Sequence, residues 1–151
     1  MQVFRLHRKK YKVELSGKGA SKIGARWNSK GTEIVYTAEN RALAMAEVVV
    51  HLSLATMPKD FMMLEINIPD DVKIKTIKNN DLPLKWNVFP FHTNTQKIGD
   101  EFIQENKYCC IKIPSVVVKG EFNILINPNH KDFKKIKIVN STDFIFDSRL
   151  F

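Results

Sequence analysis

The chain has 151 residues, a net charge of +8 at pH 7 and a hydrophobic content of 44%. This length predicts one domain with a substantial core, and the hydrophobic fraction excludes an intrinsically disordered chain. No apolar run approaches the ~20 residues that a membrane-spanning helix needs. The basic N-terminus, MQVFRLHRKKYK, lacks the apolar stretch of a signal peptide, so we expect a cytoplasmic protein.

Positive charge gathers in two short groups, HRKKYK at 7–12 and KDFKKIK at 131–137. Such a charge favours anionic partners: nucleic acid, a phosphorylated metabolite or an acidic protein. Neither group alternates with aromatic residues, and no zinc-finger or helix-turn-helix pattern accompanies them. A solvated basic surface is the simpler interpretation of each group, and nucleic-acid binding stays open.

The two cysteines, Cys109 and Cys110, are adjacent in the strand-like stretch YCCIKIP. Side chains of successive strand residues point to opposite faces, so two free thiols in a reducing compartment are favoured over a strained vicinal disulfide. The histidines are scattered along the chain. With no further cysteines, we expect no structural zinc site.

In the first half of the chain, VFRLH (3–7) alternates in polarity and predicts a strand. A polar loop follows, containing SGKGA (16–20), which has neither the ending of a phosphate-binding P-loop nor the three-glycine spacing of a dinucleotide fingerprint. TEIVYT (32–37) is β-branched and aromatic and predicts a second strand. Thr37 is the expected N-cap of a helix over 38–55.

In the second half, strands predominate. They are expected at 61–69, 72–77, 108–114, 115–118, 122–128, 134–139 and 143–147. An irregular, aromatic-rich loop is expected over 79–94, and a helix capped by Thr95 over 95–106. The order lacks regular βαβ alternation, so it predicts an α+β domain with mixed or antiparallel sheets and few helices.

Five residues have side chains suited to chemistry, and each also has an ordinary structural interpretation. Arg26, in GARWN, is a turn decoration or a clamp for a phosphate group. Tyr36 is a core phenol or a stacking platform for a flat ring, and Glu47 is a plain helix acid or a carboxylate that stabilises developing positive charge. Ser115 and Asn123 are turn and strand-end residues by default.

A longer pattern joins these residues. GARWNxxG, VYTA and a following glutamate occur together with PSVVV, EFN and NPxH, and the chain resembles the RES domain, the toxin half of bacterial RES–Xre toxin–antitoxin pairs. The matching stretches are FRLHRKKY (4–11), 16–52, LPLKWN (82–87), TQKIGDEFI (95–103), 113–138 and FDSRLF (146–151). One departure is Ala25, where many relatives have a second glycine.

The resemblance implies a fold related to ADP-ribosyltransferases and an activity that consumes NAD⁺ by breaking its nicotinamide–ribose bond. NAD⁺ is then a substrate rather than a cofactor, and no metal is required. Phosphate, water or a protein side chain stays open as the acceptor. A basic nucleic-acid-binding or RNA-cleaving toxin is the remaining alternative.

The resemblance also implies roles for individual residues. Arg26, Glu47 and Ser115 are the arginine, glutamate and serine that give the family its name. Glu47 would face the ribose, Arg26 and Arg5 would pair with the pyrophosphate, and Ser115 would contact the dinucleotide or orient Glu47. Tyr36 would pack against the nicotinamide–ribose end, with Asn123 also in the NAD⁺ site. The implied partner is an Xre-type antitoxin in a multi-chain complex, which would supply any contact with DNA.

Overall fold

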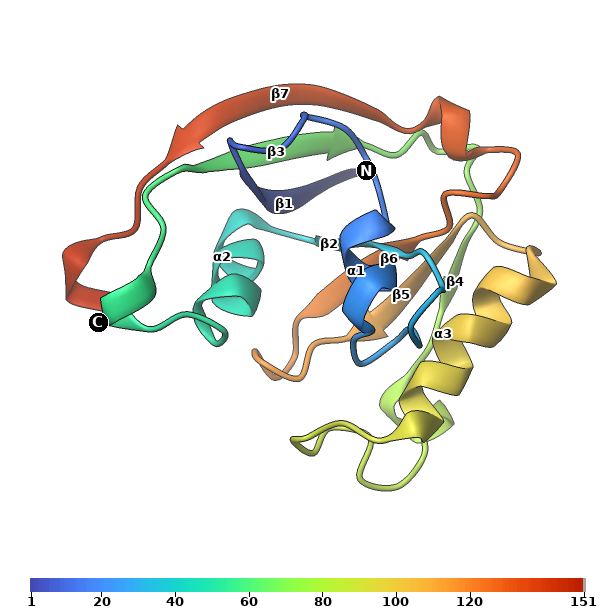
Figure 1. Ribbon diagram of the computed structural model, residues 1–151. Helices are drawn as coiled ribbons and strands as arrows, with labels where there is room; N and C mark the ends of the chain where they lie inside the picture. Colours follow the sequence, from blue (N-terminus) through green and yellow to red (C-terminus); the bar gives the residue numbers. More distant parts are fainter. Residues whose placement is uncertain (151) are drawn as a thin grey trace.

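The computed structural model describes residues 1–150, except the side chain of Leu54. These residues fold around one seven-stranded sheet (Figure 1). The strands are β1 (Gln2–Arg8), β2 (Val35–Ala38), β3 (Phe61–Asn67), β4 (Ile74–Thr76), β5 (Cys110–Pro114), β6 (Phe122–Ile126) and β7 (Lys137–Phe144). The α-helices are α1 (Lys18–Ile23), α2 (Arg41–Val49) and α3 (Thr93–Glu105). Short 3-10 turns occupy Leu54–Thr56, Asn79–Asp81, Phe133–Lys135 and Ser148–Leu150. Phe151, which ends the matched stretch 146–151, lies outside the described residues.

The sheet has the order β4-β5-β6-β2-β1-β3-β7, and its strand pairs are antiparallel except for β4 with β5. This mixed sheet with three α-helices confirms the predicted α+β class. The sheet has two halves, one of β4, β5, β6 and β2 and the other of β1, β3 and β7. They meet at a narrow junction, because β2 and β1 share only the register pair Phe4↔Ala38. In Figure 1, β1, β3 and β7 arch over one side of the molecule, while β4, β5 and β6 lie on the other side beside α3.

Three apolar clusters fill the space around these halves. One combines Val3 and Leu64 from β1 and β3 with Ile124 and Ile126 from β6. In the second cluster, α2 places Leu43 against β1 and β3. In the third, α3 covers β5 and β6 through Phe102. Burying each such side chain contributes about 1.5–3 kcal/mol, so the two helices fix the parts of the chain that carry the candidate site.

Two predictions in the first half of the chain are wrong in detail. The polar stretch after β1 contains the short helix α1 rather than a loop alone. The next helix begins at Arg41 instead of residue 38, and its N-cap is Asn40, whose Oδ1 accepts a hydrogen bond from the Leu43 amide at 2.8 Å. Thr37 belongs to β2, where its hydroxyl donates to the Ile124 carbonyl at 2.7 Å. Pairing with β6 therefore keeps Thr37 in the strand, although its side chain is suited to cap the helix.

The second half has three further corrections. Residues 115–118 form a turn instead of a strand, because Ser115 Oγ accepts the amides of Val117 and Val118. The segments 134–139 and 143–147 contribute to one strand, β7, whose polar middle is exposed at the sheet edge and gives no alternating pattern. The helix predicted over 95–106 starts at Thr93, and the Thr95 hydroxyl donates to the carbonyl of the N-cap His92 at 3.0 Å.

Both thiols are free and buried, as predicted. Cys109 precedes β5, however, and both side chains belong to the same apolar cluster, so strand alternation does not separate them. A hydrogen bond between the neighbouring thiols lowers the pKa of Cys109 and, with burial, raises that of Cys110. Separately, no helix within residues 1–150 is long and apolar enough to cross a membrane.

We predict that Gly99→Ala destabilises the fold. A Cβ at Gly99 would lie 1.5 Å from the Trp27 carbonyl oxygen, so α3 would have to move away from residues 25–29. The free energy of unfolding should fall by about 3 kcal/mol in urea titrations. Gly19→Ala in α1 is the control: its Cβ meets nothing within 4 Å, and it should be neutral or stabilising by up to about 1 kcal/mol. Equal stability of the two variants would contradict this close approach.

Candidate functional site

The centre of the candidate site is the Glu47 carboxylate on α2. Its Oε1 accepts hydrogen bonds from the Ser115 hydroxyl at 2.8 Å and from Asn123 Nδ2 at 2.6 Å. The three residues come from α2, from the connection after β5, and from β6. The structure therefore brings together a carboxylate and two polar side chains that lie about seventy residues apart in the chain.

The hydroxyl of Ser115 has little freedom. Its oxygen accepts the amides of Val117 and Val118, both at 3.1 Å, and these donors direct its single proton toward Glu47. Ser115 is buried, with 6% of its surface exposed. Of the two roles considered for Ser115, the contact present in this structure is the one that orients Glu47.

The second oxygen of Glu47 is available. Among residues 1–150, no side chain or amide donates a hydrogen bond to Oε2, and no cation forms an ion pair with the carboxylate. A carboxylate fixed through one oxygen and open at the other can accept a hydroxyl proton or stabilise a nearby positive charge.

Arg26 lies within electrostatic reach of this carboxylate. Burial lowers the pKa of the guanidinium, and the negative charge of Glu47 partly offsets that effect. Its Nη1 donates to the carbonyls of Trp86 at 2.7 Å and Val88 at 3.0 Å, and the guanidinium lies 5.9 Å from the centre of the Phe91 ring. Arg26 thus also holds the aromatic loop over 86–91, a contact that the sequence did not predict.

Tyr36 is joined to the arginine loop through Asn28. The phenol donates to Asn28 Oδ1 at 2.6 Å and accepts the Trp27 amide at 3.3 Å. Asn28 is fully buried, and its Nδ2 donates to the carbonyls of Ala20 at 2.9 Å and Thr32 at 3.0 Å. Burial raises the pKa of Tyr36 far above its ordinary value, so the phenol stays neutral.

Sequence reasoning missed Asn28 as an organising residue. The only signal was its residue type, because asparagine is common in turns, where its side chain hydrogen-bonds nearby backbone groups.

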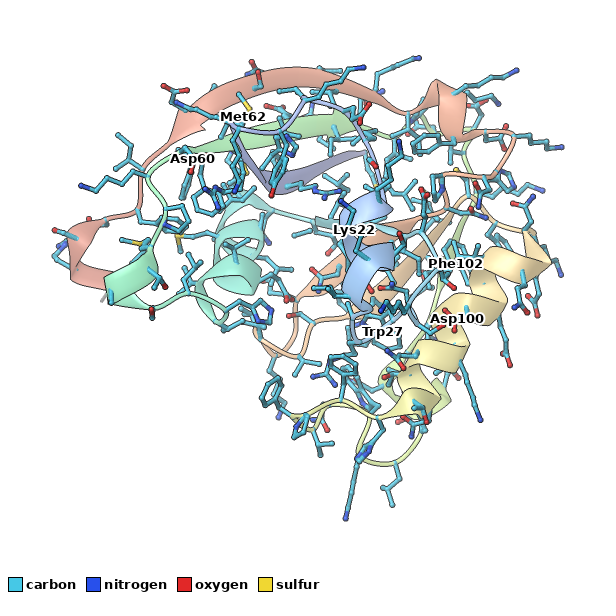
Figure 2. All side chains as sticks on the ribbon, viewed as in Figure 1. Lys22, Trp27, Asp60, Met62, Asp100 and Phe102 are labelled. Atoms are coloured by element: carbon cyan, nitrogen blue, oxygen red, sulfur yellow. The ribbon has the colours of Figure 1, made fainter. Side chains whose placement is uncertain are left out.

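Helix α3 braces the loop that carries Arg26. Gln96 Nε2 donates to the carbonyls of Ala25 and Asn28, each at 3.1 Å. The Asp100 carboxylate accepts from the amide of Ser29 at 3.0 Å and from its hydroxyl. Figure 2 labels Trp27 and Asp100 in the region where this loop meets α3. The loop is therefore held by side chains from a helix that is remote in sequence.

Arg5 contributes a second desolvated cation. It lies in β1, its Nη1 donates to the Ser16 carbonyl at 3.2 Å, and burial lowers its pKa. Within the described chain, no carboxylate lies within ion-pair distance of it, and no hydrogen bond joins it to Glu47, Ser115 or Asn123. Among the predicted site residues, Glu47 is hydrogen-bonded to Ser115 and Asn123. Arg26 interacts electrostatically with both Glu47 and Tyr36. Within the described chain, Arg5 makes no hydrogen bond with the other predicted site residues.

Over residues 1–150, no group of three or more histidine, cysteine, aspartate or glutamate side chains is arranged to hold a metal ion. The expectation that the site needs none stays a prediction.

Comparison with known families assigns the chain. The model of the RES domain matches residues 2–147, a span that includes all six predicted site residues. The chain belongs to the RES domain family. The resemblance found in the sequence is thereby confirmed over nearly the whole chain.

Curated relatives of this RES-domain protein include named toxins. It is 37% identical over 139 residues to the "Prs ADP-ribosylating toxin" of Sphingobium sp., covering 91% of this chain and 86% of the relative. It is 38% identical over 152 residues to "Toxin Res" of Photorhabdus laumondii, covering 99% and 97%. A further "Toxin Res", from Yersinia enterocolitica, is 33% identical over 152 residues, covering 99% of each chain.

The fold also resembles a solved structure, a chain of the MbcT–MbcA toxin–antitoxin complex of M. tuberculosis. The TM-score is 0.69 with 18% identity, covering 95% of this chain and 84% of that chain. At this identity the likeness concerns the fold alone.

We predict that Tyr36→Phe loosens the arginine loop of this RES domain. Removing the phenol oxygen leaves Asn28 Oδ1 and the Trp27 amide without their partner, which should lower the free energy of unfolding by about 1–3 kcal/mol in urea. Tyr11→Phe is the control, because Tyr11 is 60% exposed and the change should stay within about 0.5 kcal/mol. Matching losses in both variants would show that the contact with Asn28 is not stabilising.

Proposed function

We propose that this RES-domain protein is a toxin that consumes NAD⁺ by cleaving its nicotinamide–ribose bond, with phosphate or water as the acceptor. The observation that carries the proposal is the Glu47 carboxylate, fixed through Oε1 by Ser115 and Asn123 and open at Oε2. A cytoplasmic location is part of the proposal, since the substrate is an intracellular dinucleotide.

The chemistry suits a single oriented carboxylate. When the bond between ribose C1′ and the nicotinamide nitrogen breaks, nicotinamide leaves as a neutral molecule with the bonding electrons, and the ribose acquires oxocarbenium character. Oε2 of Glu47 would accept a ribose hydroxyl proton in a hydrogen bond and stabilise the developing positive charge. An oxygen of phosphate or water then bonds to C1′ and gives up its proton.

The two desolvated guanidiniums suit the other end of the substrate. Arg5 has no carboxylate partner within residues 1–150, and Arg26 uses only Nη1 for protein carbonyls. Both guanidiniums are half-buried and form no ion pair within residues 1–150, and a partly desolvated cation is stabilised when an anion joins it. A pyrophosphate would supply that anion, and Arg26 could hold it while keeping the loop over 86–91 in place.

Ser115, Asn123 and Tyr36 then have distinct roles. Ser115 and Asn123 would orient Glu47, which agrees with their hydrogen bonds to Oε1. Tyr36 would support the Arg26 loop through Asn28 and offer its ring to the nicotinamide–ribose end.

Protein ADP-ribosylation is the second candidate, because the Sphingobium relative is named an ADP-ribosylating toxin. The same Glu47 chemistry would apply, with a protein side chain in place of phosphate or water. The two reactions differ in their products, since only protein modification leaves ADP-ribose on a macromolecule.

The proposed partner is an antitoxin of the Xre type that keeps the toxin silent within a complex of several chains. Two observations support an antitoxin: the structural neighbour comes from a toxin–antitoxin complex, and the net charge of +8 suits an acidic partner. Contact with DNA would come through the antitoxin.

We predict that Glu47→Gln slows NAD⁺ consumption by about 100- to 1,000-fold. Gln retains an acceptor for Ser115 and Asn123, so the fold should persist while the charge is lost. Purified antitoxin-free protein is incubated with NAD⁺, with and without phosphate, and mass spectrometry identifies the products. ADP-ribose phosphate indicates phosphorolysis, free ADP-ribose indicates hydrolysis, and labelled protein indicates the second candidate.

The matched control for this experiment is Glu101→Gln on the exposed surface of α3, which should behave as the wild type. Growth inhibition should disappear with Glu47→Gln. Unchanged NAD⁺ under every condition, from folded wild-type protein, would overturn the proposed function.

We predict that Arg5→Met separates substrate binding from stability. Replacing a half-buried cation that has no ion-pair partner by an apolar side chain should leave the free energy of unfolding unchanged or raise it. The KM for NAD⁺ should rise at least about tenfold, which corresponds to ~1.4 kcal/mol of lost binding. Arg8→Met is the control, because Arg8 also lies on β1 but pairs with Asp60 at 2.7 Å, and it should leave KM unchanged. Lower stability with an unchanged KM would make Arg5 a structural residue.

A further inference from the structure

The connection between β5 and β6 is a closed hydrogen-bonded unit with Ser115 at one end and Glu121 at the other. The Ser115 amide donates to the Glu121 carbonyl at 2.8 Å, and the Glu121 amide donates to the Val118 carbonyl at 3.1 Å. Gly120, at φ +94°, provides the left-handed turn that closes it. A displacement of Glu121 would therefore also move Ser115, whose hydroxyl orients Glu47.

The side chain of Glu121 reaches across to the start of α2. Its Oε2 accepts a hydrogen bond from Asn40 Nδ2 at 2.6 Å, and Asn40 Oδ1 in turn accepts the Leu43 amide at 2.8 Å. Among residues 1–150 no lysine or arginine pairs with Glu121, although it is half-buried. The Glu121 carboxylate thus binds Asn40, the N-cap of α2, and negative charge at a helix N-terminus is favourable.

The choice of asparagine as N-cap supports this assignment. Capping alone needs only an acceptor, which serine or aspartate supplies equally well. Asparagine adds a donor, and that donor is the one that meets Glu121. Val118, from the same connection, packs against the apolar cluster that contains Leu43, so the connection and the helix are also joined by apolar contact.

We propose that Glu121 and Asn40 are positioning residues that lock α2 to the β5–β6 connection and so hold the Glu47 carboxylate on the Ser115 hydroxyl. The inference rests on the proposed function, because it assigns these residues to the NAD⁺-cleaving site. Neither residue touches the candidate reaction centre itself. Their effect is on geometry, and such effects are seen in turnover more than in substrate binding.

Four variants test this lock, the hydrogen bond between Asn40 and Glu121, by exchanging its donor and acceptor. Glu121→Gln retains an acceptor and should keep near wild-type turnover. Glu121→Ala removes it, and Asn40→Asp keeps the cap but places two carboxylates together; each should lower kcat about tenfold with KM within about twofold. The double variant Asn40→Asp with Glu121→Gln restores a donor–acceptor pair in the opposite sense, and its kcat should return to within about threefold of wild type.

Lys119→Ala is the matched control, since Lys119 lies in the same connection and makes no hydrogen bond or ion pair within the described residues. It should leave kcat unchanged. Wild-type kcat in both Asn40→Asp and Glu121→Ala, or no recovery in the double variant, would overturn the proposal.

Amide hydrogen exchange provides a readout that does not need activity. In Glu121→Ala, exchange should accelerate over both 115–121 and 40–47, and it should be slow again in the double variant. If the wild type leaves NAD⁺ untouched, the proposed function fails, yet exchange still decides whether the lock exists. Unchanged exchange in both segments would overturn the lock.

Discussion

The arrangement of the site depends on two hydrogen bonds to one oxygen, those from Ser115 and Asn123 to Glu47 Oε1. They join α2, which packs on β1 and β3, to the β5–β6 hairpin in the other half of the sheet. Since β1 and β2 share a single register pair, backbone pairing alone ties the two halves weakly at this junction. Side-chain contacts across the junction therefore determine where the carboxylate lies.

The arginine side of the site is built by a different constraint. Residues 25–29 form a loop that is closed internally by hydrogen bonds between the backbones of Ala25 and Asn28. It is held from outside by Gln96 and Asp100 of α3 and by Tyr36 of β2. The close approach of Gly99 to Trp27 is what allows α3 to reach these groups. Arg26 then extends the same network to the carbonyls of Trp86 and Val88. A charged side chain that is held from several directions can meet an anion with little reorganisation.

Much of the framework was predictable from local pattern. The alternation in 3–7, the strand predicted over 61–69, the β-branched run before Tyr36 and the helix predicted over 95–106 all correspond to elements of the structure. The errors occurred where long-range pairing outweighed local preference. Thr37 has a good capping side chain, but its hydroxyl bonds to β6 and it lies in a strand. The SVVV stretch has strand composition, but the hydrogen bonds to the Ser115 hydroxyl bend it into a turn. Local propensity is a weak guide wherever tertiary hydrogen bonds compete with it.

The sequence by itself determined the family, through motifs that run from the first strand to the last residues, and with it the identity of Arg26, Glu47 and Ser115 as candidates. Only the tertiary structure decided what these residues touch. It showed that the Ser115 hydroxyl donates a hydrogen bond to Glu47 and that Arg26 also holds the loop over 86–91, and it revealed Asn28, Asn40 and Glu121 as supporting residues. Contacts between residues as far apart as Asn40 and Glu121 depend on how the sheet and helices pack, and that packing leaves no periodic signal in the sequence.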